Sequence, residues 1–187
     1  MRLASVSGKF DLESYLAWEA TQVEKYEYHA GDVFAMVGAK LSHNTVALNL
    51  AVALKNGLRG GPCRVFGDGT KVRVEAADAV LYPDVVVTCD VRDRGPEDRF
   101  LAHPTLIVEV LSDSTAACDR GEKFALYRRL PSLREYVLVD VESRRAESFR
   151  LNAAGHWELH DCPEEIELTS LGVIIPIAEA FEGLGVD

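Results

Sequence analysis

Two acidic residues stand in otherwise apolar segments, Asp84 in YPDVVV and Glu109 in PTLIVEVLS. An ionised carboxylate that is removed from water is strongly destabilised unless a partner compensates its charge. Buried acids of this kind are typical of catalytic and metal-binding sites. We therefore expect a compensating group close to both residues.

The two acids face each other if their segments form neighbouring antiparallel strands. Side chains of a strand point alternately to its two faces, so the register decides which residues meet. A register with Val87 opposite Leu106 puts Asp84 opposite Glu109, whereas a slip by one residue turns Asp84 to the other face. Two like charges at that distance repel each other, which calls for a neutral acid, a bound cation or a cationic side chain.

A divalent cation would satisfy both acids at once. Two carboxylates, a backbone carbonyl and several water molecules make the oxygen shell that Mg²⁺ prefers, and Mn²⁺ can replace it. The alternative is a purely structural pair that backbone amides or an arginine such as Arg73 would satisfy.

A lysine that could join the acids lies farther along the chain. Asp119, Lys123 and Tyr127 recur at intervals of four residues, which places them on one face of a helix. Lys123 could hold an attacking water and stabilise negative charge on a phosphate. The simpler interpretation is an exposed Asp119–Lys123 ion pair, worth roughly a few tenths of a kcal/mol.

These residues require a sheet with helices packed on it. The apolar patterns and turn residues predict helices over 10–20, 41–61 and 114–133, the last ending near Pro131, and a hairpin over 26–38 with a Gly31-Asp32 turn. Strands are expected over 63–68, 70–76, 79–90, 104–112, 134–142, 144–151, 156–161 and 164–170, with a short C-terminal turn docked by Phe181 and Leu184. This order predicts an α/β or α+β fold in a single domain over 1–187.

The helix expected over 41–61 has the clearest pattern. Ser42 is a candidate N-cap, and Gly57 or Gly60-Gly61 would end the helix. Its expected apolar face is made of the aliphatic residues Val46, Leu48, Leu50, Val52 and Leu54.

The composition argues against several classes of protein. The first twenty residues lack the unbroken apolar segment of a signal peptide, and no apolar run reaches the length of a membrane span, which predicts a cytoplasmic protein. The formal net charge of −10 argues against a large nonspecific surface for polyanions. The four cysteines have no C-x-x-C spacing, so we expect reduced thiols and neither a zinc ribbon nor a redox pair.

The chain resembles the Uma-type restriction-endonuclease family of the PD-(D/E)xK nuclease superfamily. The resemblance rests on YEYHAGDVFAM, SHNTVALNL, YPDVVV, LIVEVLSDST, DRGEKFALYRR and REYVLVD, which occur in this order along most of the chain. It implies a restriction-endonuclease-like core, with a central mixed sheet flanked by helices and additional β-hairpins. It also implies Mg²⁺-dependent hydrolysis of phosphodiester bonds in nucleic acid, with DNA as the expected substrate.

The resemblance assigns roles to individual residues. It implies that Asp84 and Glu109 bind the metal, that the carbonyl of Val110 completes the shell and that Glu27 adds a further carboxylate. His43 matches a histidine of the family pattern. Without the resemblance, Glu27 would be interpreted as an exposed hairpin residue. His43 would be interpreted as a hydrogen-bond partner of a helix end or of a neighbouring side chain.

One position departs from the usual superfamily motif. A conventional E-x-K motif would carry lysine at 111, where this chain has Leu111. The resemblance implies that Lys123 supplies the positive charge in place of a lysine at 111. Lys71 in DGTKVRV is a second candidate for this role.

Two other classes of function are compatible with the sequence. A nuclease fold without activity could bind nucleic acid or a protein partner, and the apolar later strands would suit a homodimer. Candidate DNA contacts are the arginines of VRDRGPEDRF and of the end of the last helix: Arg92, Arg94, Arg99, Arg128 and Arg129. The acids within VRDRGPEDRF favour a solvated loop of mixed charge for the first three.

Overall fold

The computed structural model describes residues 10–36, 38–112 and 115–185. The expectation that no signal peptide is present concerns in part residues 1–9, which lie outside these ranges. No helix in the described ranges is both long and apolar enough to cross a membrane.

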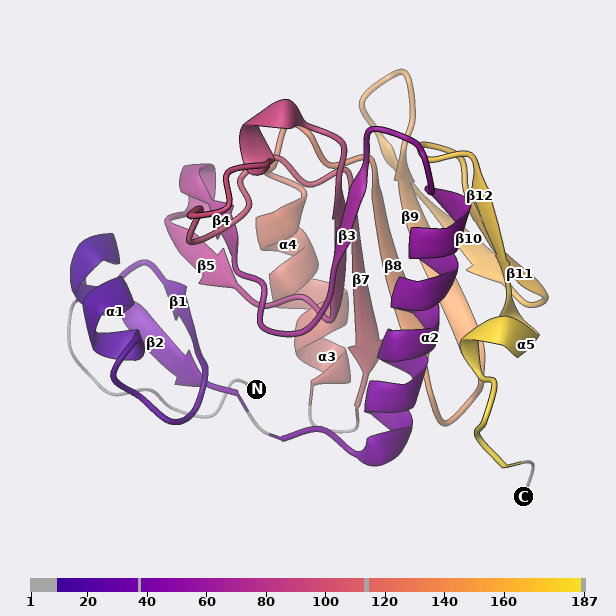
Figure 1. Ribbon diagram of the computed structural model, residues 1–187, viewed down its shortest axis with the longest axis horizontal. Coiled ribbons are helices and arrows are strands. Elements are labelled where there is room, and N and C mark those ends of the chain that lie inside the picture. Colours follow the sequence, from indigo (N-terminus) through magenta and orange to yellow (C-terminus); the bar gives the residue numbers. More distant parts are fainter. Residues whose placement is uncertain (1–9, 37, 113–114, 186–187) are drawn as a thin grey trace.

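A six-stranded mixed sheet forms the centre of the molecule (Figure 1). Its order is β10-β9-β8-β7-β6-β3, and β7 and β8 are its parallel pair, which confirms the predicted mixed sheet. The strands are β3 (Arg64–Phe66), β6 (Val85–Thr88), β7 (Leu106–Leu111), β8 (Glu135–Asp140), β9 (Arg145–Leu151) and β10 (Trp157–Cys162). β6 and β7 are buried on both faces, as expected from their continuous apolar runs.

The predicted register between β6 and β7 is confirmed. The two strands are antiparallel, with Val87 opposite Leu106 and Val85 opposite Val108. One step beyond Val85, the same register leads to Asp84 on one strand and Glu109 on the other. The slip by one residue, which would turn Asp84 to the other face, does not occur.

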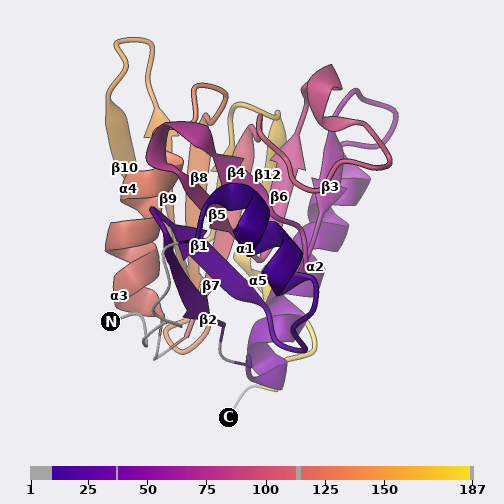
Figure 2. The same cartoon turned by 90° about the vertical axis from the view of Figure 1, so that its left-hand side faces the viewer.

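A smaller antiparallel sheet lies beside the central one, with α1 (Leu12–Glu19) packed on it (Figure 2). Its order is β2-β1-β5-β4, and its strands are β1 (Tyr26–His29), β2 (Asp32–Ala35), β4 (Val72–Val74) and β5 (Ala79–Leu81). The β1–β2 turn is formed by Ala30 and Gly31, both with positive φ, and not by the predicted Gly31-Asp32 pair. Two positive φ angles suit the right-handed twist of a hairpin.

Two short 3-10 turns, η1 (Glu75–Ala77) and η2 (Val91–Asp93), connect strands at the edges of the two sheets. The first links β4 to β5, and the second lies in the polar connection between β6 and β7.

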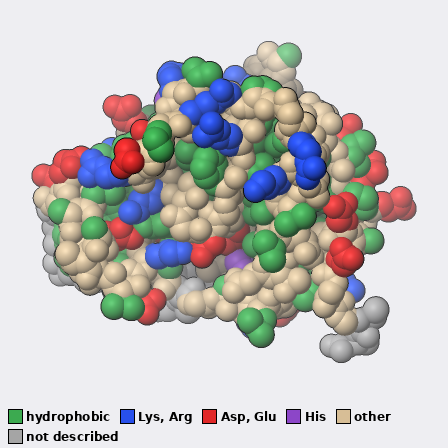
Figure 3. All heavy atoms as spheres, viewed as in Figure 1, with side chains coloured by type: hydrophobic (Ala, Val, Ile, Leu, Met, Phe, Trp, Pro, Cys, Tyr) green, Lys and Arg blue, Asp and Glu red, His purple; other side chains and the backbone are tan. Residues whose placement is uncertain are grey.

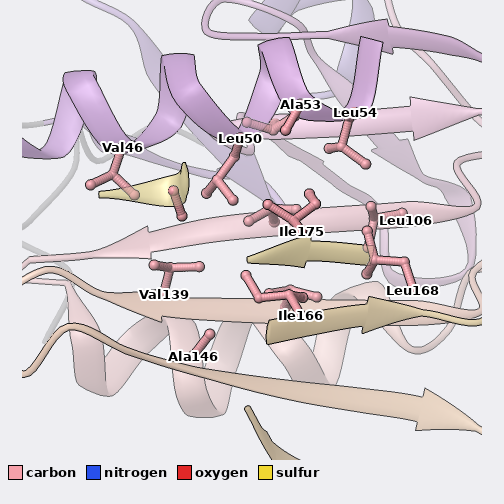
Figure 4. Packing of buried hydrophobic residues seen from close by; sticks show 14 of the residues in the cluster. Val46, Leu50, Ala53, Leu54, Leu106, Val139, Ala146, Ile166, Leu168 and Ile175 are labelled. Atoms are coloured by element: carbon pink, nitrogen blue, oxygen red, sulfur yellow. The ribbon is translucent and has the colours of Figure 1, made fainter. Parts of the chain in front are cut away.

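Helix α2 (Leu41–Gly57) covers one face of the central sheet and ends at Gly57, as predicted. Its inner side chains Val46, Leu50, Ala53 and Leu54 are buried in one core with residues of β7, of β8 and of the segment 166–175 (Figure 4). The expected apolar face is wrong at two positions, because Leu48 and Val52 are 64% and 48% exposed. At 3.6 residues per turn, or about 100° per residue, both lie on the side of the helix opposite to the buried stripe.

The predicted cap of this helix is also wrong. Lys40 occupies the N-cap position, and no side-chain hydrogen bond among the described residues caps the helix there. Ser42 lies inside the first turn.

The opposite face of the sheet carries a second helical segment. It consists of α3 (Ala116–Cys118), a π-helical turn η3 (Asp119–Lys123) and α4 (Phe124–Tyr127). Ser114, the first residue of the helix predicted here, lies outside the described residues. Gly121, which weakens an α-helix, falls in the π-helical turn.

The last part of the chain folds back over α2. β11 (Glu165–Leu168) pairs with β12 (Val173–Pro176), and α5 (Ile177–Ala180) follows. The strands predicted over 156–161 and 164–170 are therefore present but do not pair with each other, and β12 was not predicted. The inward residues of the hairpin are buried in the α2 core and are therefore covered within the chain: Ile166, Leu168, Val173 and Ile175.

A buried carboxylate fastens this hairpin to the sheet. Glu135, at the start of β8, is 1% exposed. Its oxygens accept hydrogen bonds from the backbone N–H groups of Thr169 (3.0 Å) and Ser170 (3.2 Å), and Arg150 Nε lies 3.4 Å away. The charge is thus compensated by an arginine and by the turn between β11 and β12.

The expectation of reduced cysteines is wrong for one pair. Cys63 and Cys89 form a disulfide, whereas Cys118 and Cys162 are buried thiols outside any disulfide of the described residues. The pairing of Arg64 with Thr88 brings the preceding and following cysteines side by side at the end of β3 and β6. This proximity depends on strand register and leaves no C-x-x-C signature in the sequence.

Candidate functional site

Asp84 and Glu109 line one pocket of about 480 Å³, between the first turns of α2 and the π-helical turn η3. We call it the carboxylate pocket, and its chemically important lining residues are His43, Asp84, Glu109, Asp119 and Lys123. On the face shown in Figure 3, acidic side chains and a histidine meet near the centre, below a group of basic side chains.

Asp84 joins the two strands that carry the acids. Its Oδ2 accepts the backbone N–H of Val110 at 2.7 Å, at the point where the β6–β7 ladder has ended. Its Oδ1 accepts no hydrogen bond from the described residues, so that oxygen is available to a ligand. The strand end thus fixes the direction of this carboxylate.

His43 reaches Asp84 from the first turn of α2. Its Nε2 lies 3.3 Å from Asp84 Oδ2, and its side chain is 13% exposed. Burial alone would lower the pKa of His43, but the carboxylate of Asp84 raises it above its usual value. The structure therefore places the histidine of the family pattern against the first acid of the site.

Glu109 is 2% exposed and binds two side chains of the helical segment. Its Oε1 accepts hydrogen bonds from Lys123 Nζ at 3.1 Å and from Tyr127 Oη at 3.2 Å. The predicted common face of Asp119, Lys123 and Tyr127 is thus the face turned to Glu109.

The ammonium group of Lys123 lies among three carboxylates. Its Nζ is 3.1 Å from Glu109, 3.3 Å from Asp119 and 3.4 Å from Glu27. The exposed Asp119–Lys123 pair considered above is excluded as a description, because the two side chains are 2% and 10% exposed.

The charges in this cluster do not balance. Burial alone would lower the pKa of Lys123, but the carboxylates around it raise that pKa well above its usual value. Burial raises the pKa of Glu109 well above its usual range, since one ammonium cannot offset the surrounding acids. The cluster therefore favours a charged lysine and disfavours the simultaneous ionisation of all its acids in the absence of a further cation.

The π-helical turn helps to place this lysine. Tyr136 of β8 donates its hydroxyl to the carbonyl of Asp119 at 2.8 Å. Single π-helical turns within helices are frequent at functional sites. Burial raises the pKa of Asp119 as well, and Lys123 counteracts this rise. Tyr136 was not among the predicted residues, because only its hydrogen bond to the helical segment packed on the sheet distinguishes it from an ordinary core residue.

Glu27 enters the site from the small sheet. Its Oε1 accepts the backbone N–H of Tyr82 at 3.2 Å, and the residue is 5% exposed. The simple exposed-hairpin interpretation of Glu27 is therefore wrong.

Lys71, the rival lysine, lies in a neighbouring network. Its Nζ is 2.8 Å from Glu19 Oε2, and Tyr82 donates its hydroxyl to the other oxygen of Glu19. Lys71 and Lys25 both lie over the ring of Tyr82. Tyr82 and Glu19 were missed, although the position of Tyr82 two residues before Asp84 was a usable signal.

The arginines considered as partners or DNA contacts are mostly bound elsewhere. Arg73, the structural alternative for the acid pair, instead binds Asp78 at 2.9 Å. Arg92 binds Asp90, Arg99 binds Glu13, and Arg94 donates to the carbonyl of Pro62.

The residues of the carboxylate pocket fit Mg²⁺ by the type of their donor atoms. Within the described ranges, no three His, Cys, Asp or Glu side chains converge as a ready-made metal site. Mg²⁺ does not require one, because it commonly binds one or two carboxylates and keeps several waters. The free Oδ1 of Asp84 and the excess of acids over Lys123 are compatible with that mode.

Comparisons with known proteins agree with this fold. A family model described as "Putative restriction endonuclease", the Uma2 family, matches residues 12–180. Two uncharacterized proteins of Synechocystis sp. are 37% and 30% identical over 94% and 78% of this chain, which correspond to 93% and 82% of their own lengths.

A solved structure is similar as well. The crystal structure of "a putative nuclease belonging to DUF820" from Anabaena variabilis superimposes with a TM-score of 0.77 at 15% identity, over 92% of this chain and 97% of the other. The similarity supports the restriction-endonuclease-like fold. With nearly its whole length matched by the family model, the chain belongs to the Uma2 family.

Proposed function

We propose that the protein is a metal-dependent nuclease that hydrolyses phosphodiester bonds of nucleic acid, with DNA as the expected substrate. The observation that carries the proposal is the meeting of Asp84 and Glu109 in one pocket, with Lys123 Nζ 3.1 Å from Glu109. Membership of a family described as restriction endonucleases supports the same chemistry.

Asp84 and Glu109 would hold Mg²⁺ or Mn²⁺ together with the carbonyl of Val110, and Glu27 would support the site from behind Lys123. When bound, the cation would supply Lewis-acid stabilisation of the charge that develops on the phosphate. The position of Lys123 Nζ 3.1 Å from Glu109, together with the raised pKa of the lysine, supports a role as a charged hydrogen-bond donor to the phosphate or to the attacking water. A lysine that keeps its proton is not a general base.

His43 and Tyr127 would act as positioning residues. His43 contacts the bound oxygen of Asp84, and Tyr127 donates to the oxygen of Glu109 that also faces Lys123. Both contacts limit the rotation of the carboxylates, which favours a fixed ligand geometry.

A cleavage assay tests the proposal directly. Purified protein would be incubated with double-stranded DNA, single-stranded DNA and RNA in Mg²⁺, Mn²⁺ or EDTA. We expect metal-dependent cleavage that Asp84→Ala and Glu109→Ala reduce at least a hundredfold, while the exposed Glu164→Gln retains it. Absence of metal-dependent cleavage, or full cleavage by both alanine variants, would exclude the proposal.

One observation favours a second candidate, a nuclease fold that binds a partner without cleaving. Lys123 already places a positive charge among the acids, and Leu111 stands where the usual motif has lysine. For this candidate, calorimetry would detect no Mg²⁺ binding, and partner binding would be unchanged in Asp84→Ala. We also propose a cytoplasmic location and a homodimer. Light scattering would measure the molar mass in solution and so test the homodimer.

A further inference from the structure

A second cavity, of about 1050 Å³, lies at the other end of β6 and β7. Its lining includes Asp90, just after β6, and Thr105, just before β7. At about 3.3 Å per strand residue, the distances from Thr105 to Glu109 and from Asp90 to Asp84 correspond to roughly 13 and 20 Å. The cavity is therefore separate from the carboxylate pocket.

This cavity concentrates positive charge on an acidic protein. Four arginines line it, Arg73, Arg92, Arg129 and Arg134, against the two acids Glu75 and Asp90. We call it the arginine cavity. The chain as a whole has a formal net charge of −10, so four arginines around one cavity are a local departure from its acidic surface.

The four arginines differ in how far they are already neutralised. Arg73 is bound by Asp78 and Arg92 by Asp90. Arg134 donates only to the main-chain carbonyls of Pro131 and Leu133, and Arg129 is exposed. Within the described ranges, neither Arg129 nor Arg134 forms an ion pair, so both guanidinium groups can bind an anion.

A histidine with a fixed ring completes the polar lining. His103 Nδ1 lies 2.9 Å from Asp93 Oδ1, and Asp93 also accepts the backbone N–H groups of Ala102 and His103. Asp93 is 4% exposed, so it holds the ring firmly and leaves Nε2 as the nitrogen open to a ligand. The hydroxyl of Ser132, which also lines the cavity, is buried and has no hydrogen-bond partner among the described residues.

We propose that the arginine cavity binds a phosphate group, through Arg129, Arg134 and Nε2 of His103, independently of the carboxylate pocket. Guanidinium groups bind phosphate oxygens with paired hydrogen bonds. Because Nδ1 of His103 faces the carboxylate of Asp93, Nε2 donates to a phosphate oxygen when the ring is protonated, and the hydroxyl of Ser132 can add a further donor. The phosphate can belong to a nucleic-acid strand or to a free phosphate compound. The proposal does not depend on nuclease activity.

Isothermal titration calorimetry at constant ionic strength tests this site, with inorganic phosphate and with a short single-stranded oligodeoxynucleotide as probes. The test variant is Arg129→Gln, because this side chain is exposed and has no side-chain partner among the described residues. Arg128→Gln is the matched control, since Arg128 is its exposed neighbour but does not line the cavity. Glu109→Gln reports on the carboxylate pocket, and thermal unfolding checks each fold.

We expect saturable binding of phosphate that Arg129→Gln weakens at least fivefold and that Arg128→Gln and Glu109→Gln change by less than twofold. Competition by the oligodeoxynucleotide, lost in Arg129→Gln, would identify a strand phosphate as the ligand, and phosphate binding without competition would identify a free compound. Absence of saturable phosphate binding, an equal loss in Arg128→Gln, or a loss confined to Glu109→Gln would overturn the proposal.

Discussion

Val110 donates its backbone N–H to Asp84 Oδ2 at 2.7 Å, so an acid of the site also continues the pairing of β6 with β7. Asp84 therefore has a structural role in addition to the proposed metal-binding role. Substitutions can separate the two, because asparagine keeps an oxygen acceptor but loses the charge.

For Asp84→Asn, we expect cleavage to fall at least a hundredfold with little change in the free energy of unfolding. Asp84→Ala should lose cleavage to the same extent and also lose about 1–2 kcal/mol of stability, since the N–H of Val110 is then unpaired. Urea unfolding and the cleavage assay would be run on the same preparations. Equal stability of the two variants would contradict the structural role.

Glu135 should be important for stability although it lies outside the carboxylate pocket. In Glu135→Ala, Arg150 and the turn residues Thr169 and Ser170 lose their buried acceptor. We expect a loss of about 3 kcal/mol in urea unfolding. Glu135→Gln, which keeps one acceptor, should lose less.

The control for this experiment is Glu165→Ala, at the exposed start of β11. It should change the free energy of unfolding by less than about 0.5 kcal/mol. A comparable loss in both alanine variants would show that the hairpin is not held by Glu135.

The acid side of the stability profile should depend on Asp78. Burial alone would raise the pKa of Asp78, but hydrogen bonds from Arg73 and Tyr28 lower it below its usual value of 3.8. A carboxyl group with a lowered pKa in the folded state stabilises the fold above the unfolded pKa, and this contribution is lost as the pH falls through the folded pKa.

Asp78→Asn is the suitable variant, because Asp78 has a φ of 47° and asparagine tolerates this conformation. We expect the wild type to be more stable by at most about 1 kcal/mol, since the carboxylate is half exposed. The difference should be constant from pH 8 to pH 5 and shrink below pH 3.8, in urea unfolding at each pH. A difference that grows with acid would be incompatible with the lowered pKa.

The disulfide can be tested by counting thiols. Denatured protein prepared without reductant should show two reactive thiols, from Cys118 and Cys162, and four after reduction. Cys63→Ser should show three in both conditions. Four thiols in the unreduced wild type would indicate that Cys63 and Cys89 are reduced, which is the state expected in a reducing cytoplasm.

Much of the site followed from local patterns in the sequence. The segments around Asp84 and Glu109 suggested the register that the structure has, although a slip by one residue was equally compatible with their continuous apolar runs, and helical spacing placed Lys123 beside Asp119. Glu27 and His43 were identified only through the family resemblance, because nothing in their own segments shows that they approach the acids.

The remaining features depend on contacts between distant segments. The clamp at Glu135, the Cys63–Cys89 disulfide and the Asp93–His103 pair each join residues whose proximity is decided by the packing of sheets and loops. The strand β12 has four residues and ends in Pro176, which is too short for alternation to predict. Leu48 was predicted in the apolar face of its helix but is exposed, because its apolar character alone does not show which side of the helix meets the sheet.

The position of the β11–β12 hairpin also has a consequence for biosynthesis. The inner face of α2 is completed by Ile166, Ile175 and Phe181, which the ribosome adds more than a hundred residues after the helix itself. During translation, Leu50 and Leu54 must therefore remain without part of their native neighbours for most of the elongation time. This helix is the segment of the nascent chain where we expect chaperones to bind.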